Sequence, residues 1–212
     1  MKQAVESQAF RHAAREHEAD AFGMWIFIGS EAMLFGAIVL VFLVARIDHP
    51  KAFGDASSHL SLTLGTANTA ILITSSFTMA LADLLAKLER WRAAAWTMAA
   101  TATLGAVFIV VKGTEYALEI SEGIAPILSL PFHFPGSDPR GAQLFVELYF
   151  AMTSLHAAHL LGGIAAILVI LSMWRRSTGA SCLRRTQAIG LYWHFVDIVW
   201  VFLFPLLYLI DR

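Results

Sequence analysis

Residues 22–45 read FGMWIFIGSEAMLFGAIVLVFLVA, an apolar segment in which Glu31 is the only charged residue. As a helix this segment would extend about 36 Å at roughly 1.5 Å per residue, which exceeds the roughly 30 Å hydrocarbon core of a bilayer. Apolar runs of this length are typical of transmembrane helices rather than of soluble cores. The segment therefore predicts an integral membrane protein.

Four further segments are long and apolar enough to cross a bilayer. They run over about residues 60–85, 93–120, 143–174 and 188–210. These runs far exceed the roughly 9–11 alternating residues of a barrel strand, which excludes a closed barrel. We therefore expect an all-α fold, in which a segment at 1–20 precedes one bundle of five transmembrane helices at 21–212.

Composition agrees with this fold class. Of the 212 residues, 58% are hydrophobic and 15% are charged, whereas a typical soluble domain carries about 25% charged residues. The net charge of -1 gives no indication of a nucleic-acid partner. Cys182 is the only cysteine, so neither an internal disulfide nor a cysteine-based metal site can form, and we expect an inert thiol in a loop.

The positions of Lys and Arg predict the orientation in the membrane. If the N-terminus lies inside, the inner loops and terminus carry 10 of the 15 Lys and Arg residues. An excess of positive charge marks the cytoplasmic side of a membrane protein. We therefore expect a cytoplasmic N-terminus and an external C-terminus. The first apolar run is too long for the core of a signal peptide, so it should remain as an anchor.

Several ionisable residues fall at membrane depth, where each is costly and needs a partner or a function. Glu31 has no other charge in its own segment, which predicts that it is protonated or paired. His156 and His159 are three residues apart and should share a helix face, as should His194 and Asp197. Counting from the cytoplasmic ends places Glu31 at the depth of His194 and Asp197, so we expect it to face that pair.

The other polar positions predict contacts between helices, each worth about 1 kcal/mol or less. In the second segment they are Asn68, Thr69, Ser75 and Ser76. Lys112 and Glu115 are three residues apart near an outer end, which predicts an ion pair at the membrane interface. We expect Glu115 and Glu147 to lie where a carboxylate can reach water.

Five motifs, taken in chain order, resemble subunit III of the haem-copper cytochrome oxidases. They are GMWIFIGSE at 23–31, Asn68-Thr69 with Ser75-Ser76, Glu115-Tyr116, the stretch from Tyr149-Phe150 through Thr153, His156 and His159 to Gly162-Gly163, and YWHFVDIVW at 192–200. The last motif resembles the family's final helix nearly residue for residue. Longer members of the family have seven helices, so this chain is similar to the short five-helix bacterial forms.

The resemblance implies a subunit of a proton-translocating terminal oxidase in a bacterial cytoplasmic membrane. Subunit III of this family binds neither haem nor copper, which belong to its partners, subunits I and II. It binds phospholipid, supports assembly and assists proton uptake by subunit I. Glu31 occupies the position of the family's carbodiimide-reactive carboxylate. The resemblance leaves the electron donor, cytochrome c or quinol, open.

Other functions compete with this interpretation. The five-helix form also resembles the accessory protein of some nitric oxide reductases. A di-metal or haem site could draw on Glu31, His156, His159, His194 and Asp197, but carboxylate-bridged bundles use Glu-x-x-His pairs, and none occurs at membrane depth. A transporter would show broken helices and internal repeats, and no repeat is visible. We expect no catalytic residue, metal or cofactor in this chain.

Overall fold

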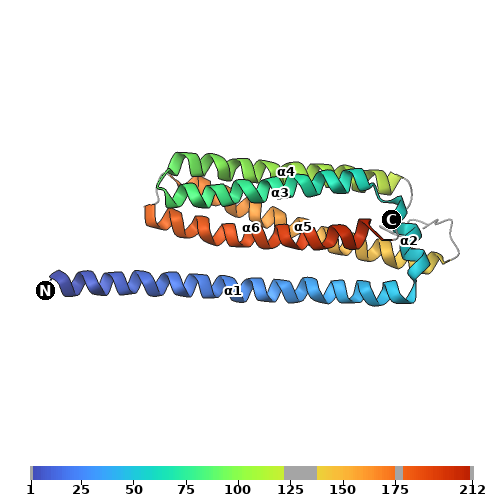
Figure 1. The fold of residues 1–212 in the computed structure, drawn as a ribbon, viewed down its shortest axis with the longest axis horizontal. Coiled ribbons are helices and arrows are strands. Elements are labelled where there is room, and N and C mark those ends of the chain that lie inside the picture. Colours follow the sequence, from blue (N-terminus) through green and yellow to red (C-terminus); the bar gives the residue numbers. More distant parts are fainter. Residues whose placement is uncertain (1, 122–137, 175–178, 211–212) are drawn as a thin grey trace.

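The computed structural model describes residues 2–121, 138–174 and 179–210, which form helices and no strand (Figure 1). The helices are α1 (Lys2–Asp48), α2 (Pro50–His59), α3 (Leu62–Lys87), α4 (Trp91–Ser121), α5 (Pro139–Met173) and α6 (Gly179–Tyr208). The predicted all-α fold class is confirmed.

Stretches of five of these helices are long and apolar enough to cross a membrane. They are Phe22–Asp48, Leu62–Lys87, Trp91–Ser121, Pro139–Met173 and Ser181–Tyr208. Each overlaps one predicted segment, and the largest difference is the start of the last span, at Ser181 instead of residue 188. The helix starts earlier because its backbone hydrogen bonds continue through polar residues that precede the apolar run. Cys182 accordingly lies buried in α6, not in a loop as expected.

The body of the bundle consists of α3, α4, α5 and α6. Helix α3 packs against α4 and α6, and α5 packs against the same two helices. Helix α1 lies along the outside of this body, against α5 and α6, and its N-terminal part extends beyond the bundle (Figure 1). We call the end of the bundle that contains the α3–α4 turn the α3–α4 end, and the opposite end the α2 end.

Helix α2 lies in the connection between the first two predicted spans. Pro50 starts the helix, where its missing N–H costs nothing. Phe53 is fully buried against Phe42 and Phe145, at ring-centroid distances of 5.2 and 5.3 Å. The Ser57 hydroxyl donates to the Leu207 carbonyl at 2.8 Å. This short helix therefore covers the α2 end of the bundle.

Close helix packing depends on two glycines that face Trp193, a fully buried residue of α6. A Cβ at Gly105 would lie 2.9 Å from Cη2 of the indole, and a Cβ at Gly163 would lie 3.1 Å from its Cε3. Small residues let membrane helices approach closely. These two glycines thus bring α4 and α5 against α6 around one large side chain.

Candidate functional site

Glu31 of α1 is paired with His159 of α5. The Oε2 atom of Glu31 lies 2.9 Å from Nε2 of His159, and the side chains are 18% and 14% exposed. The other ring nitrogen, Nδ1, lies 2.8 Å from the Leu155 carbonyl, which can only accept a hydrogen bond. Nδ1 therefore carries a proton, and the bond to Glu31 needs a second proton, either on Nε2 or on the carboxyl group.

The expectation that Glu31 faces His194 and Asp197 is wrong. Nδ1 of His194 lies 2.8 Å from the Ser76 hydroxyl of α3. Depth along a helix does not fix the direction of a side chain around the helix axis, and His194 points toward α3 while Glu31 contacts α5. Tyr192 contributes to the actual pair, because its hydroxyl donates to the His159 carbonyl at 2.8 Å.

His156 and His159 contact different parts of the protein, although they are three residues apart on α5. The His156 ring is fully buried against Phe108 and Trp200, at ring-centroid distances of 5.5 and 5.1 Å. Neither ring nitrogen has a hydrogen-bond partner among the described residues. His156 therefore belongs to the interior of the bundle, whereas His159 links α5 to α1.

Three of the four polar residues predicted in α3 tie that helix to α6. Thr69 accepts a hydrogen bond from the Trp200 indole N–H at 3.1 Å, and Ser75 accepts one from the Trp193 indole N–H at 3.0 Å. Ser76 binds His194. Asn68 is fully buried, and its side chain has no partner in the described part of the chain.

Lys112 and Glu115 form the predicted ion pair, with Nζ and Oε2 2.9 Å apart. Both residues are 2% exposed, however, so the pair is buried and not interfacial, and Glu115 does not reach water. The prediction is wrong because the ends of α5 and α6 pack over this part of α4. Glu147, by contrast, is exposed as expected.

Two tyrosines complete a network around this ion pair. The Lys112 ammonium donates to the hydroxyls of Tyr149 and Tyr208, each at 2.7 Å. Tyr208 in turn donates to Glu115 at 2.8 Å, and Tyr149 donates to Glu119 at 2.7 Å. All three ammonium protons are thereby used. The sequence analysis did not place Tyr149, Tyr208 or Glu119 in such a network, although a buried tyrosine hydroxyl generally signals a polar partner.

A second unforeseen contact lies at the α2 end, outside the spans. Asp138 caps α5 by accepting a hydrogen bond from the Gly141 N–H at 3.0 Å, and its Oδ2 lies 2.6 Å from Nδ1 of His49. The hydrogen bond from the Gly141 N–H lowers the pKa of Asp138 below its ordinary value, and the contact with His49 lowers this pKa by a smaller amount. This carboxylate links the end of α1 to the start of α5.

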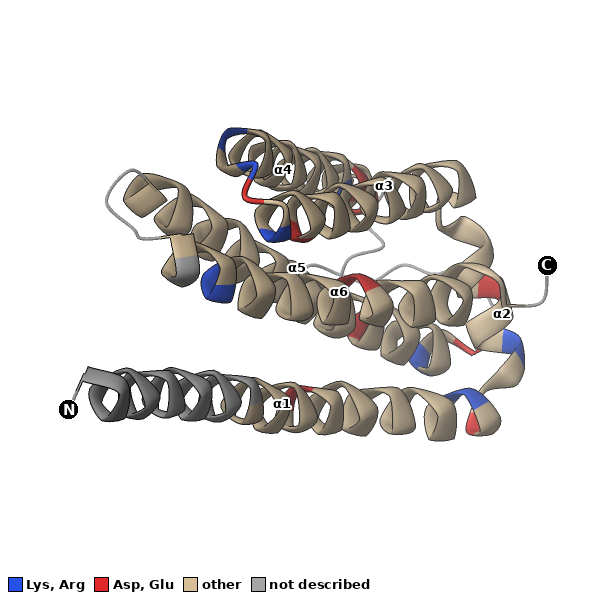
Figure 2. Cartoon of the chain, turned by 60° about the vertical axis from the view of Figure 1, so that its left-hand side comes forward, with Lys and Arg blue, Asp and Glu red and all other residues tan. Residues whose placement is uncertain are grey.

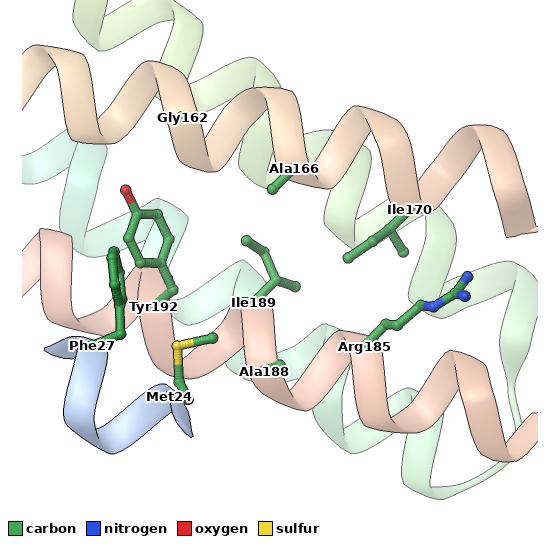
Figure 3. A pocket seen from close by; sticks show the side chains of 9 residues that line it. All are labelled: Met24, Phe27, Gly162, Ala166, Ile170, Arg185, Ala188, Ile189 and Tyr192. Carbon is green, nitrogen blue, oxygen red and sulfur yellow. The ribbon is translucent and has the colours of Figure 1, made fainter. Parts of the chain in front are cut away.

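An apolar groove of about 410 Å³ lies between part of α1 and the α5–α6 pair (Figure 3). Met24 and Phe27 line it from α1, and Gly162 and Ala166 form part of its opposite wall. The guanidinium of Arg185 lies at one end (Figure 3). The groove thus combines a long apolar surface with one cationic group.

The predicted site residues therefore separate into distinct contacts and do not converge on one centre. Within the described ranges, no three His, Cys, Asp or Glu side chains gather closely enough to hold a metal ion.

Comparison with known proteins identifies the family. The model of the family described as cytochrome c oxidase subunit III matches residues 4–211. Cytochrome c oxidase subunit 3 of Thermostichus vulcanus is 30% identical over 218 residues, covering 100% of both chains. Cytochrome bo(3) ubiquinol oxidase subunit 3 of Pseudomonas aeruginosa is 30% identical, covering 93% of this chain and 88% of the relative.

A third relative, cytochrome c oxidase subunit 3 of Alkalihalophilus pseudofirmus, is 33% identical over 93% of this chain and 89% of its own length. The relatives named here are all oxidase subunits, which favours the oxidase interpretation over a nitric oxide reductase or a metal-binding protein. The chain is a multi-pass membrane protein that belongs to the cytochrome c oxidase subunit III family.

Proposed function

We propose that this chain is the non-catalytic subunit III of a bacterial haem-copper terminal oxidase and packs against the subunits I and II that hold haem and copper. The observation that carries the proposal is the family match over residues 4–211, nearly the whole chain. The polar contacts described above are consistent with this role, since they join helices to one another.

The proposed orientation has the N-terminus and the α3–α4 end in the cytoplasm. Lys and Arg lie mainly near the helix ends and leave the middle of the bundle nearly free of positive charge (Figure 2). The loop excess of these residues supports the cytoplasmic assignment. Glu31 and His159 then lie in the cytoplasmic half of the membrane, the side from which an oxidase takes up protons.

The proposed assistance to proton uptake rests on this pair. The bond between Glu31 and His159 holds a proton whichever of the two residues carries it, and both side chains remain partly exposed. A proton held near the uptake side can be passed on without waiting for one from bulk water. We propose that this shortens the time for which the partner's reaction centre waits to be reprotonated.

Phospholipid is the proposed occupant of the groove between α1 and the α5–α6 pair. An acyl chain suits its apolar walls, and the Arg185 guanidinium can bind a phosphate group at its end. Such a lipid would stabilise α1, which packs on the other spans mainly through α5 and α6.

Deletion of the gene tests the proposed function. The remaining oxidase is purified and assayed for oxygen reduction with reduced cytochrome c and, separately, with a quinol. We expect a near-normal initial rate followed by inactivation after fewer turnovers than in the complete complex, or poor recovery of the assembled oxidase. Expression of the chain from a plasmid should restore the lifetime.

A fully assembled oxidase with no initial activity would contradict the non-catalytic role. Failure of the tagged chain to co-purify with any haem-bearing subunit would contradict the proposed function altogether.

A further inference from the structure

A pocket of about 300 Å³ opens between α3 and α6 on the outer surface of the bundle. Its walls are mainly apolar, and three polar side chains lie among them: Ser76, His194 and Asp197. Ser76 and His194 are hydrogen-bonded to each other at 2.8 Å. Among the described residues, Asp197 is the member of this group whose side chain has no hydrogen-bond partner.

The Asp197 side chain is deeply placed. The residue is 5% exposed, and neither carboxylate oxygen has a hydrogen-bond partner among the described residues. The Ser76 hydroxyl lies close to it, but that hydroxyl has one proton and also binds His194. Among the described residues, Ser76 can therefore supply at most one hydrogen bond to Asp197.

The position of Asp197 along α6 excludes the ordinary sources of a donor. It lies about 24 Å from Ser181 and about 16 Å from Tyr208, counting roughly 1.5 Å per residue along the span. Lipid headgroups lie at the membrane surface, and the acyl chains at this depth have no donor. Bulk water is absent from the hydrocarbon core. A donor for the ionised carboxylate at this depth would come from another transmembrane segment.

We infer that this pocket is the docking site for a transmembrane helix of a partner oxidase subunit, which inserts a hydrogen-bond-donating side chain toward Asp197. The inference rests on the proposed function and adds the surface through which the subunit is held. The volume of the pocket suits one long donor side chain, such as arginine, lysine, tyrosine or tryptophan.

The surroundings of the pocket fit a helix as the occupant. Ala80 lines it from α3 and leaves room for a close backbone approach. Phe77 and Ile198, on either side of the pocket, are 69% and 55% exposed and provide apolar contact area for a neighbouring helix. A partner helix would thus cover apolar surface and satisfy the carboxylate at once.

Site-directed photocrosslinking in the complete oxidase tests the inference. A photoreactive phenylalanine analogue is placed at Phe77, and in a matched control at Met33 of α1, which is 79% exposed. We expect the Phe77 position to crosslink to a different oxidase subunit, and the crosslinked peptide to carry a donor residue within one helical turn. The Met33 position should not crosslink to that peptide.

Substitution of Asp197 tests whether the crosslink from the Phe77 position depends on the carboxylate. Asp197→Ala should weaken retention of the chain by the complex roughly three- to tenfold, measured as the co-purified fraction at rising detergent concentration. The same variant should reduce the Phe77 crosslink. Glu147→Ala, which removes an exposed carboxylate on α5, should change neither quantity. Circular dichroism of the isolated variants shows whether each still folds.

The inference fails if the chain co-purifies with the oxidase but Phe77 crosslinks only to lipid, only to a second copy of this chain, or to nothing. It also fails if folded Asp197→Ala is retained like the wild type. These results leave the proposed function intact, since they come from a chain that is still part of the oxidase.

Discussion

Glu31 and His159 show how one backbone carbonyl can determine the protonation of a side-chain pair. Because Leu155 accepts from Nδ1, a hydrogen bond between Nε2 and the Glu31 carboxyl group requires a proton on one of these two groups. The pair is neutral when that proton is on Glu31, and an imidazolium–carboxylate pair when it is on His159. Both forms keep the net charge of the pair at zero, which suits a site within a membrane.

Substitutions of Glu31 test whether the hydrogen bond or the charge holds α1 to α5. In Glu31→Gln the amide can donate to Nε2, so we expect a loss of stability below about 0.5 kcal/mol. In Glu31→Ala, Nε2 loses its partner, and we expect a loss of about 1 kcal/mol. The measurement is thermal unfolding of the purified chain in detergent. Equal losses in the two variants would show that the carboxylate charge is required.

Asp138, at the α2 end, should make the stability of the folded chain depend on pH. Its lowered pKa in the folded chain means that the ionised form stabilises the fold at pH values above its ordinary pKa of about 3.9. This stabilisation is lost as the pH falls through the lower folded pKa. Asp138→Asn retains a capping side chain but has no such dependence, so the stability difference between wild type and variant should shrink from pH 7 to pH 3.

Thermal unfolding in detergent at several pH values measures this difference. The matched control is Asp55→Asn, which changes an exposed carboxylate of α2. A wild-type advantage over Asp138→Asn that persists undiminished at pH 3 would contradict the assignment.

Two lysines with carboxylate partners allow burial to be compared directly. Lys112 is buried with Glu115, while Lys87 pairs with Asp83 at 2.6 Å with a side chain that is 51% exposed. Lys112→Met leaves buried carboxylates without their cation, and we expect a loss of about 3–5 kcal/mol. Lys87→Met should cost less than about 1 kcal/mol. Similar losses of thermal stability in the two variants would show that water reaches the Lys112 network.

At the scale of helices, two helices approach closely where one of them has a glycine on the face that meets the other. Helices α4 and α5 approach α6 where Gly105 and Gly163 face the Trp193 ring. Helix α1 has no such approach, since no side chain lies within 4 Å of an added Cβ at Gly23, Gly29 or Gly36. Its attachment depends on polar contacts and aromatic packing, including that of Phe35 on His159.

Two glycines of α4 test this distinction. Gly105→Ala places a methyl group 2.9 Å from the Trp193 ring, and we expect a loss of about 1–3 kcal/mol from overpacking. Gly113→Ala adds a methyl group with nothing within 4 Å, so it should be neutral or stabilising by up to about 1 kcal/mol. Thermal unfolding measures both. A neutral Gly105→Ala would mean that α4 and α6 can separate freely at this point.

At the scale of the whole molecule, the proposed orientation predicts which end meets the cytoplasm. In a Cys182→Ser background, single cysteines replace two exposed residues, Arg90 at the α3–α4 end and Lys51 at the α2 end. A membrane-impermeant thiol reagent should label Lys51→Cys in intact spheroplasts, and Arg90→Cys only after the membrane is opened or inverted. The reverse pattern would overturn the orientation.

The sequence by itself predicted five membrane spans, each of which matches a long apolar helix in the described part of the chain, and identified the resemblance to the family. Both depend on local properties, because the transfer of a segment into a bilayer is set by its own apolar length. The spans at 22–45 and 60–85 needed no knowledge of their neighbours. Apolar length does not predict α2, because this helix is short and polar and becomes helical against α5 and α6.

Only the tertiary structure decided which polar groups meet. Helical spacing placed Glu31 and His194 at one depth, but the rotation of each helix about its axis gave them the separate partners His159 and Ser76. In the same way, Lys112 and Glu115 paired as their spacing required, but their burial depends on residues of α5 and α6 that are distant in sequence. Side-chain packing across several helices sets the rotation of each helix and the burial of each polar pair. Neither property can therefore be predicted from the sequence of one segment.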